Sequence, residues 1–160
     1  MNILWYYKFP IGIIGIAEDD NGITNIFFDN DNNCIDKSNF ILMETTLINK
    51  TANQLYEYFN HKRKIFDVPL SIHGTEFQNK VWLSLVKIPY GETKSYQDIA
   101  KNIGNEKACR AVGNANNKNP ICIIIPCHRV IGKNMSLTGY AGGIHIKKYL
   151  LDLEKNINNK

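Results

Sequence analysis

The stretch "SYQDIAKNIGNEKACRAVGNANN" (Ser95–Asn117) decides the fold of its half of the chain. Ser95 with Asp98 has the capping-box pattern of a helix start, and Gly104 can supply the left-handed residue that ends this helix. Asn105 is expected to cap a second short helix. Two short helices joined by a glycine-containing turn predict a helix-turn-helix, in which the second helix docks on DNA. The alternative is a helix pair that only packs within the fold, as most such pairs do.

The second of these helices has two unlike faces. At helical spacing, the buried face is expected to hold Ala108, Val112 and Ala115, and the opposite face Arg110, Gly113, Asn114 and Asn117. Gly113 and the short Asn114 would let the backbone approach a surface closely, which leaves Arg110 as the long side chain of this patch. Such an arginine can insert among bases or contact phosphate; the alternative is a solvated arginine.

A thiol, an imidazole and a guanidinium follow an apolar run in "NPICIIIPCHRV" (Asn119–Val130). The run ICIII predicts a strand buried on both faces, which Pro126 stops. Cys127 would then lie where a buried segment emerges. A thiol attacks only as thiolate, and His128 and Arg129 could activate it if the chain turns here, or through water. The residues alone leave a nucleophile and an inert buried thiol equally open.

Metal and phosphate sites are not indicated. Cys122, Cys127, His128 and His145 lack the paired short spacings of structural zinc sites. Cys34, Cys109 and Cys122 are expected to be small core residues. The glycine-rich "SLTGYAGG" lacks the spacing of a phosphate-binding loop. We expect it to wrap a small flat ligand instead.

Two further helices are predicted in this half. Thr75 with Gln78 forms a capping box before a helix that ends at Pro89, and a last helix carries Glu154 near its end. Their apolar stripes are Phe77, Val81, Leu85 and Ile88 in the first helix and Ile146, Tyr149, Leu150 and Leu153 in the last. A carboxylate at a helix C-terminus opposes the helix dipole, so Glu154 is either a plain surface residue or held by a partner such as an imidazole.

The first half of the chain predicts a small sheet and one helix. Two β-rich runs are joined by Asn21-Gly22, a dipeptide favoured in tight hairpins because both central residues need positive φ. Helical spacing then relates Ile48, Ala52, Leu55 and Phe59. The fold class is therefore α+β. A small N-terminal αβ domain, an antiparallel hairpin or sheet plus a helix, is expected over residues 1–70, and a mostly helical domain with the helix-turn-helix over 71–160.

Composition and charge narrow the class of protein. The 160 residues are 44% hydrophobic, and no apolar run approaches the roughly 18 residues of a membrane span. Without a secretory signal or a C-x-x-C pair, we expect a cytoplasmic protein with free thiols. Residues 1–70 hold 6 Lys+Arg against 9 Asp+Glu, whereas residues 71–160 hold 13 against 6. If the positive charges of the second half cluster on one face, they indicate a polyanionic partner. If they do not cluster, they serve only to keep the protein soluble.

The segment from Gly74 to Glu154 closely resembles the active-site domain of the O6-alkylguanine-DNA alkyltransferases. The resemblance is carried by "SYQDIA", "CRAVGNANNKNP" and "PCHRV", and it covers about half of the 160 residues. The first half is similar to that family's small αβ domain only in its order of hairpin and helix. The resemblance implies direct DNA repair, in which one alkyl group moves irreversibly from guanine O6 to a cysteine after the base is flipped out.

The resemblance also implies a role for individual residues. Cys127 would be the alkyl acceptor. His128 would act on its thiol through a water and be held by Glu154, and Asn119 would order the turn that carries the cysteine. Arg110 would fill the space left by the extruded base, while Tyr96 would rotate a phosphate or contact the base. The guanine pocket would be lined by the backbone around Val130 and by Tyr140, Ala141 and Gly142.

The implied partner is double-stranded DNA that carries O6-alkylguanine, bound in the minor groove by a monomer with little regard to sequence. No metal or cofactor is implied. Cys109 and Glu106 stand where the family commonly has alanine and proline, and a bulkier, more acidic helix face could weaken groove binding.

Two other functions fit part of the pattern. A noncatalytic protein could recognise the lesion and keep it, although relatives of that kind lack the acceptor cysteine. A cysteine hydrolase could use Cys127 and His128, and it would turn over repeatedly on a small ester or amide.

Overall fold

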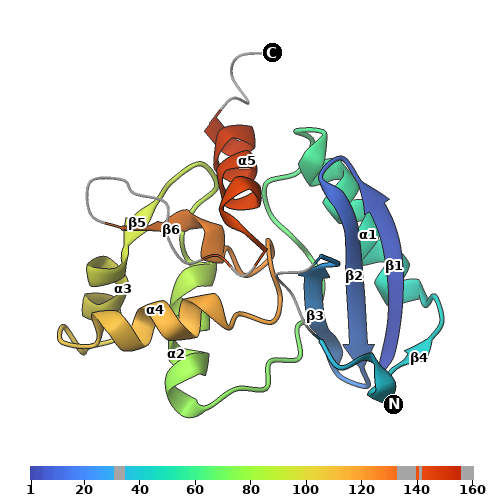
Figure 1. The fold of residues 1–160 in the computed structure, drawn as a ribbon, viewed down its shortest axis with the longest axis horizontal. Coiled ribbons are helices and arrows are strands. Elements are labelled where there is room, and N and C mark those ends of the chain that lie inside the picture. Colours follow the sequence, from blue (N-terminus) through green and yellow to red (C-terminus); the bar gives the residue numbers. More distant parts are fainter. Residues whose placement is uncertain (31–34, 133–139, 141, 156–160) are drawn as a thin grey trace. The chain divides into compact units, whose positions relative to one another are not determined.

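The structure is a computed structural model that describes residues 1–30, 35–132, 140 and 142–155 (Figure 1). The chain divides into two compact units, Met1–His73 and Gly74–Lys160, and each is described by itself. Cys34 and Ala141, for which the sequence makes predictions, lie outside the described residues, as does most of "SLTGYAGG". None of the helices in the described ranges is long and apolar enough to cross a membrane.

The first unit is a four-stranded sheet with one long helix. Its strands are β1 (Ile3–Phe9), β2 (Gly12–Asp19), β3 (Gly22–Phe28) and β4 (Ile41–Leu42), in the order β3-β2-β1-β4. β1 to β3 pair antiparallel, whereas the short β4 pairs parallel to β1. A 3-10 turn, η1 (Lys37–Asn39), precedes β4, and α1 (Thr46–Phe59) lies against one face of the sheet (Figure 1). The helix is where its apolar spacing predicts, because Ile48, Ala52, Leu55 and Phe59 are all buried.

The hairpin between β2 and β3 is confirmed, but its centre differs from the prediction. Asp19 pairs with Gly22, so that Asp20 and Asn21 form the loop and Asn21 does not have a positive φ. The Asp19 carboxylate accepts hydrogen bonds from the backbone N–H of Asn21 (2.8 Å) and Gly22 (3.2 Å). Gly22 has a φ of 153°, and a Cβ there would lie 2.7 Å from the carbonyl oxygen of Pro69. The close approach of the Pro69 backbone and the positive φ both require a glycine here.

The second unit is mostly helical. Its elements are α2 (Glu76–Val86), β5 (Lys94–Ser95), α3 (Tyr96–Asn102), α4 (Cys109–Asn117), the 3-10 turn η2 (Cys127–Arg129), β6 (Val130–Ile131) and α5 (Ile144–Lys155). Both predicted capping boxes are present, at Thr75 and at Ser95. Trp82 of α2 donates its indole N–H to the carbonyl of Ala115 in α4 at 2.8 Å, which ties the two helices together. The α+β prediction is confirmed.

The helix-turn-helix is formed by α3 and α4, but Asn105 does not cap the second helix. Gly104 ends α3 with a φ of 81°, as expected. Residues 105–108 then make a separate turn, and α4 begins after Ala108 without a side-chain cap. Gln97 of α3 holds this turn instead. Its amide donates to the carbonyl of Glu106 at 3.1 Å and accepts a hydrogen bond from the Cys109 thiol at 2.9 Å.

The run ICIII is buried as predicted except for the half-buried Ile124, but it is not a strand. Residues 121–125 form a compact turn, in which the N–H of Ile125 donates to the carbonyl of Ile121 at 3.0 Å and Ile123 has a φ of 71°. A β-branched residue rarely adopts a positive φ, so local propensity opposes this turn. The Asn119 side chain supplies the hydrogen bonds that a neighbouring strand would otherwise provide.

The last helix is confirmed, but its buried face is rotated from the predicted one. Ile146, Leu150 and Leu153 are buried, whereas Tyr149 is 37% exposed. Lys147, Leu151 and Glu154 are buried as well. A stripe of apolar residues does not predict the buried face of this helix, because two of the residues on that face, Lys147 and Glu154, are charged.

Candidate active site

The turn that carries Cys127 is fixed by two asparagine side chains. Asn119 donates to the carbonyl of Ile125 at 2.7 Å and accepts from the N–H of Ile121 at 3.0 Å. Asn116 of α4 donates to the carbonyl of Cys127 itself at 3.3 Å. Both asparagines are buried, so these bonds do not compete with bulk water. The cysteine is therefore attached to α4 as well as to its own turn.

A buried carboxylate lies at the centre of the site. Glu154 of α5 is 2.6 Å from His128 Nε2 and accepts two hydrogen bonds from Arg129, at 2.9 and 3.1 Å. It also accepts a hydrogen bond from the N–H of Gly91 at 3.1 Å, and Arg129 donates to the carbonyl of Ile88 at 2.7 Å. These bonds tie η2 to α5 and to the loop after α2. Of the two alternatives for Glu154, the structure shows the one in which partners hold it.

The protonation of this cluster follows from burial and from its hydrogen bonds. Burial by itself raises the pKa of Glu154, but hydrogen bonds and positive charge from His128 and Arg129 hold that pKa well below its usual range. Burial lowers the pKa of His128, against the opposing effect of Glu154, so the imidazole is neutral at pH 7. Because a carboxylate only accepts, Nε2 carries the imidazole proton. The buried Nδ1 makes no hydrogen bond to the described residues and can accept a proton.

The Cys127 thiol has a lowered pKa although it is buried. The largest cause is a hydrogen bond from Cys122, with smaller contributions from Asn119 and from the positive charge of Lys147, and burial opposes them. Cys122 correspondingly has a raised pKa. The thiolate, which is the reactive form of cysteine, is thus favoured at Cys127. No direct hydrogen bond joins this thiol to His128 among the described contacts, which leaves the relay through water as the open prediction.

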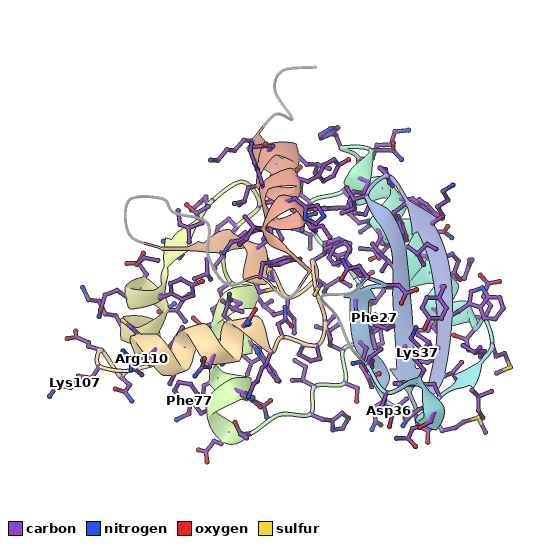
Figure 2. All side chains as sticks on the ribbon, in the orientation of Figure 1. Phe27, Asp36, Lys37, Phe77, Lys107 and Arg110 are labelled. Carbon is purple, nitrogen blue, oxygen red and sulfur yellow. The ribbon has the colours of Figure 1, made fainter. Side chains whose placement is uncertain are left out.

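The exposed face of α4 has the expected members. Arg110, Asn114 and Asn117 are exposed, and Figure 2 places Arg110 near the N-terminal end of α4, beside Lys107. Gly113 is half-buried, and a Cβ built on it would lie 3.8 Å from the ring of Tyr96. The structure therefore brings Tyr96 against the glycine of this α4 face.

Two short parallel strands, β5 and β6, connect the helix-turn-helix to the turn that carries the thiol. Val130 of β6, which directly follows η2, pairs with Lys94 of β5, and Ile131 pairs with Ser95. Ser95 is the N-cap of α3, so Tyr96 begins its helix at the end of this two-stranded sheet. The predicted DNA-contacting and alkyl-accepting residues are thus parts of one unit.

The segment predicted to line a base pocket is described in part. Val130, Tyr140 and Gly142 are buried. Ala141, the fourth predicted member, lies outside the described residues.

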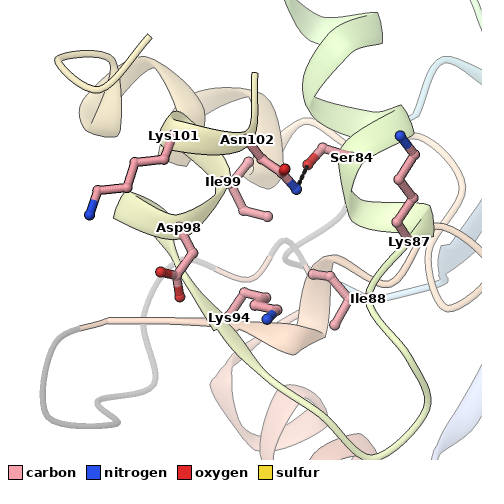
Figure 3. A pocket seen from close by; sticks show the side chains of 8 residues that line it. All are labelled: Ser84, Lys87, Ile88, Lys94, Asp98, Ile99, Lys101 and Asn102. Carbon is pink, nitrogen blue, oxygen red and sulfur yellow. Dashed lines mark hydrogen bonds between the residues drawn. The ribbon is translucent and has the colours of Figure 1, made fainter. Parts of the chain in front are cut away.

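A separate pocket of about 350 Å³ lies among α2, β5 and α3 (Figure 3). It is lined by Ser84, Lys87, Ile88, Lys94, Asp98, Ile99, Lys101 and Asn102, and Asn102 donates to the Ser84 hydroxyl at 3.2 Å. None of the residues predicted for the active site lines it. Within the described ranges, no three His, Cys, Asp or Glu side chains are grouped so that they could hold a metal ion.

Three residues shape the site in ways that the sequence does not predict. Arg129 was noted only as a positive neighbour, yet it makes two hydrogen bonds to Glu154. Asn116 and Lys147 were not singled out. Asn116 directly follows Ala115 on the predicted buried face, and Lys147 lies four and seven residues before Leu151 and Glu154. A polar residue on the buried side of a helix was the available signal.

The fold and the site define a protein in which a helix-turn-helix and an activated buried thiol share one compact unit. A family model described as "6-O-methylguanine DNA methyltransferase, DNA binding domain" matches residues 76–156. A second, described as "6-O-methylguanine DNA methyltransferase, ribonuclease-like domain", matches residues 3–72. The chain belongs to the 6-O-methylguanine DNA methyltransferase family.

Individual relatives agree with this assignment over nearly the whole chain. The methylated-DNA–protein-cysteine methyltransferase of Methanosarcina acetivorans is 50% identical over 148 residues, which cover 92% of this chain and 95% of the relative. The crystal structure of Mycobacterium tuberculosis O6-methylguanine methyltransferase has a TM-score of 0.91 at 42% identity, covering 98% of this chain and 94% of the other. Mycobacterium tuberculosis OGT in complex with DNA has a TM-score of 0.89 at 42% identity, covering 96% and 93%.

Proposed function

We propose that this protein repairs O6-alkylguanine in double-stranded DNA by moving the alkyl group onto the sulfur of Cys127, once per molecule. Relatives at about half identity bear the name of this activity. The observation that carries the proposal is the Cys127 turn, where a thiol of lowered pKa sits beside the buried His128–Glu154 pair. A site that only bound the lesion would not need an acidified thiol.

The transfer is a single displacement at carbon. The Cys127 thiol proton passes through a water to His128 Nδ1, and Glu154 stabilises the imidazolium that forms. The thiolate then attacks the alkyl carbon, a carbon–sulfur bond forms, and the bond to guanine O6 breaks with its electron pair on the base. The guanine anion takes up one proton, which balances the one that the thiol gave to His128, and the base stays in the DNA as ordinary guanine. Because water does not readily cleave a thioether, the protein is consumed.

The base has to leave the helix before this reaction. Extrusion costs a few kcal/mol, which contacts of α4 in the minor groove offset. Gly113 and Asn114 allow the close approach, Arg110 enters the stack, and Tyr96 turns a phosphate or contacts the base. Val130, Tyr140, Ala141 and Gly142 line the pocket that receives it.

Binding of this kind depends mainly on charge. The basic second half of the chain contacts phosphates, so affinity falls with salt and depends little on sequence. We further propose that the protein acts as a monomer in the cytoplasm, where an acceptor cysteine stays reduced. No metal or cofactor takes part.

Intact-mass measurement before and after incubation with duplex DNA containing O6-methylguanine tests the proposal. The expected result is one added methyl group per protein, mapped to Cys127, and none for Cys127→Ser. Cys109→Ser, which removes a half-buried thiol that donates to Gln97, should still take up one methyl. Binding without a mass change would assign the protein to lesion sensing. Many turnovers on a small ester, with DNA untouched, would assign it to the cysteine hydrolases.

A further inference from the structure

A groove whose walls carry lysines lies between α2 and α3. The pocket of about 350 Å³ among α2, β5 and α3 adjoins a second hollow of about 230 Å³, and the two share Ser84, Lys87 and Asn102. We call the two hollows together the lysine groove. Figure 3 shows Lys87 on the α2 side of the larger hollow, and Lys94 and Lys101 across it on β5 and α3. The lysines that line the groove are Lys80, Lys87, Lys94 and Lys101.

The protein does not neutralise the positive charge of the lysine groove. All four lysines are exposed, and none forms an ion pair with a described residue. Asp98, the acidic residue of the lining, is used to cap α3: its carboxylate accepts a hydrogen bond from the N–H of Ser95 at 2.9 Å, which is the main cause of its lowered pKa. Four lysines and one aspartate leave a net charge of +3 around the groove. Since like charges held close together disfavour the fold, this lining suits an anion from outside the chain.

The spacing of the lysines fits an extended anion better than a small one. Lys80 and Lys87 are seven residues apart, so they lie on the same side of α2, separated by two turns or about 10 Å. A single phosphate group can contact only one end of such a row. A nucleic-acid backbone carries one charge for about every 3.4 Å of helix axis on each strand, and it can therefore meet lysines along the whole groove. Lysine binds phosphate as a point charge, whatever the base.

The lysine groove and the exposed face of α4 lie on different sides of α2. Trp82 donates its indole N–H to the carbonyl of Ala115, so it marks the side of α2 that packs on α4. Lys80 and Ser84 are two residues from Trp82 in either direction, which turns them about 160° away from it. Arg110 lies on the exposed face of α4, opposite the face that packs on α2. DNA on that exposed face is separated from the lysine groove by the thickness of two helices, roughly 20 Å.

We infer that the lysine groove binds the phosphate backbone of a second DNA duplex, so that one protein molecule holds two duplexes at once. The inference rests on the proposed function only in placing the first duplex on α4. A molecule bound at an undamaged site would then pass to another duplex through a complex with both, without being free in between. Because lysines on phosphate do not read base edges, the second contact depends neither on sequence nor on the lesion.

Exchange of the protein between undamaged duplexes tests the inference. Whole protein is loaded on a fluorescently labelled duplex and mixed in a stopped-flow instrument with an excess of unlabelled duplex at constant salt. For the wild type, the rate at which the label is released should rise in proportion to the concentration of unlabelled duplex, because the second duplex binds before the first one leaves. Lys87→Gln/Lys101→Gln should lose this dependence and keep the affinity for a single duplex. Lys8→Gln/Lys50→Gln, which removes two exposed charges from the first unit, is the matched control and should exchange as the wild type does.

Other outcomes overturn the inference. If Lys87→Gln/Lys101→Gln exchanges as the wild type does, the two lysines only keep the protein soluble. If this variant loses affinity for a single duplex as strongly as it loses exchange, the lysines belong to the contact that α4 makes. Acceleration by poly-glutamate equal to that by DNA would assign the groove to acidic protein segments, and a complete block by inorganic phosphate at constant ionic strength would assign it to a single small anion. Exchange that depends on the unlabelled duplex, in a protein that takes up no methyl group, would refute the proposed function and leave the second DNA site standing.

Discussion

His128 Nε2 and Glu154 Oε2 are 2.6 Å apart, and both side chains are almost completely buried. The same carboxylate accepts two hydrogen bonds from Arg129 and one from the N–H of Gly91. Glu154 thus orients the imidazole and also neutralises a buried guanidinium. A carboxylate near the end of a helix would otherwise be unfavourable, since it opposes the dipole.

Replacement of Glu154 by Gln should weaken the fold and slow the reaction together. The variant leaves the charge of Arg129 buried without its counter-ion, which costs on the order of 3–5 kcal/mol of unfolding free energy. It also loses the negative charge that stabilises the imidazolium formed during transfer, so the single-turnover rate should fall about 100-fold. Denaturant unfolding and quenched-flow alkyl transfer measure the two effects.

Asp152→Asn, on the same helix, is the matched control. Asp152 forms an exposed i,i+4 ion pair with Lys148 at 2.7 Å. Exposed helix pairs of this kind contribute roughly 0.3–0.5 kcal/mol, so the control should leave stability and rate nearly unchanged. If both variants lost the same stability, the buried cluster would not be what holds α5 in place.

The unfolding free energy should fall in two steps as the pH is lowered. The pKa of His128 is lower in the folded than in the unfolded protein, so the unfolded state binds a proton first and stability falls below pH ~6.5. The pKa of Glu154 is also lowered, so its contribution is present above pH ~4.3 and is lost at more acidic pH. His128→Gln should remove the first step, and Glu154→Gln should reduce the second, to which Asp19, with its pKa lowered to about 2, also contributes. A wild-type stability that stays flat from about pH 7 to 5 contradicts a neutral buried imidazole.

Sequence reasoning predicted the elements whose signals are local. The capping boxes at Thr75 and Ser95 and the terminator Gly104 are correct because each involves only residues within one turn. The strand predicted for ICIII is wrong because hydrophobic patterns do not register that a side chain, here that of Asn119, can satisfy the backbone of a buried turn. Asn105 is not the N-cap because α4 begins only after Ala108, and residues 105–108 form a separate turn that Gln97 holds.

The site could be predicted only where neighbours in sequence carry it. Cys127 and His128 stand in one motif, whereas Glu154 meets the N–H of Gly91 across 63 residues, a contact that no spacing rule reveals. The family resemblance supplied the link between His128 and Glu154. Lys147 was missed because a lysine is rarely fully buried, and a hydrophobicity pattern treats it as surface.

Lys147→Met should stabilise the protein below pH 8 and shift its reaction to higher pH. Burial lowers the pKa of Lys147 to about 8, against the opposing effect of Cys127, so below that pH the folded state holds a charge that burial disfavours. Wild-type stability therefore rises from about pH 8 toward the unfolded pKa of ~10.4, whereas the variant, on the order of 2 kcal/mol more stable at pH 7, gains nothing there. Without this cation the pKa of Cys127 should rise, and so should the midpoint of the rate–pH profile. A variant less stable at every pH would mean that Lys147 is compensated by its neighbours.

Gly113→Ala should separate the fold of α4 from its contact with DNA. The added Cβ would lie 3.8 Å from the Tyr96 ring, an ordinary contact, and alanine favours a helix over glycine by about 0.5–1 kcal/mol. The variant should therefore be slightly more stable. If the backbone of α4 approaches the groove at this residue, affinity for duplex DNA should fall about tenfold, or 1.4 kcal/mol, by fluorescence anisotropy. Reaction with a free alkylated guanine base should not change; a change there would place Gly113 near the base pocket instead.

Arg110→Ala should impair repair of a paired lesion more than repair of an unpaired one. Arg110 is exposed, so its removal leaves the fold intact. If the guanidinium fills the space of the flipped base, the variant should transfer alkyl groups from a normal duplex about 100-fold more slowly, and a lesion opposite an abasic site should largely restore the rate, because unpaired bases are cheaper to extrude. Lys118 lies at the exposed C-cap of the same helix, so Lys118→Ala removes only a surface charge. This variant should lower the affinity for both DNA substrates alike, by a factor that depends on salt. Equal losses on both substrates for Arg110→Ala would assign the arginine to a phosphate contact, and base extrusion would then have to be stabilised elsewhere on α3 and α4.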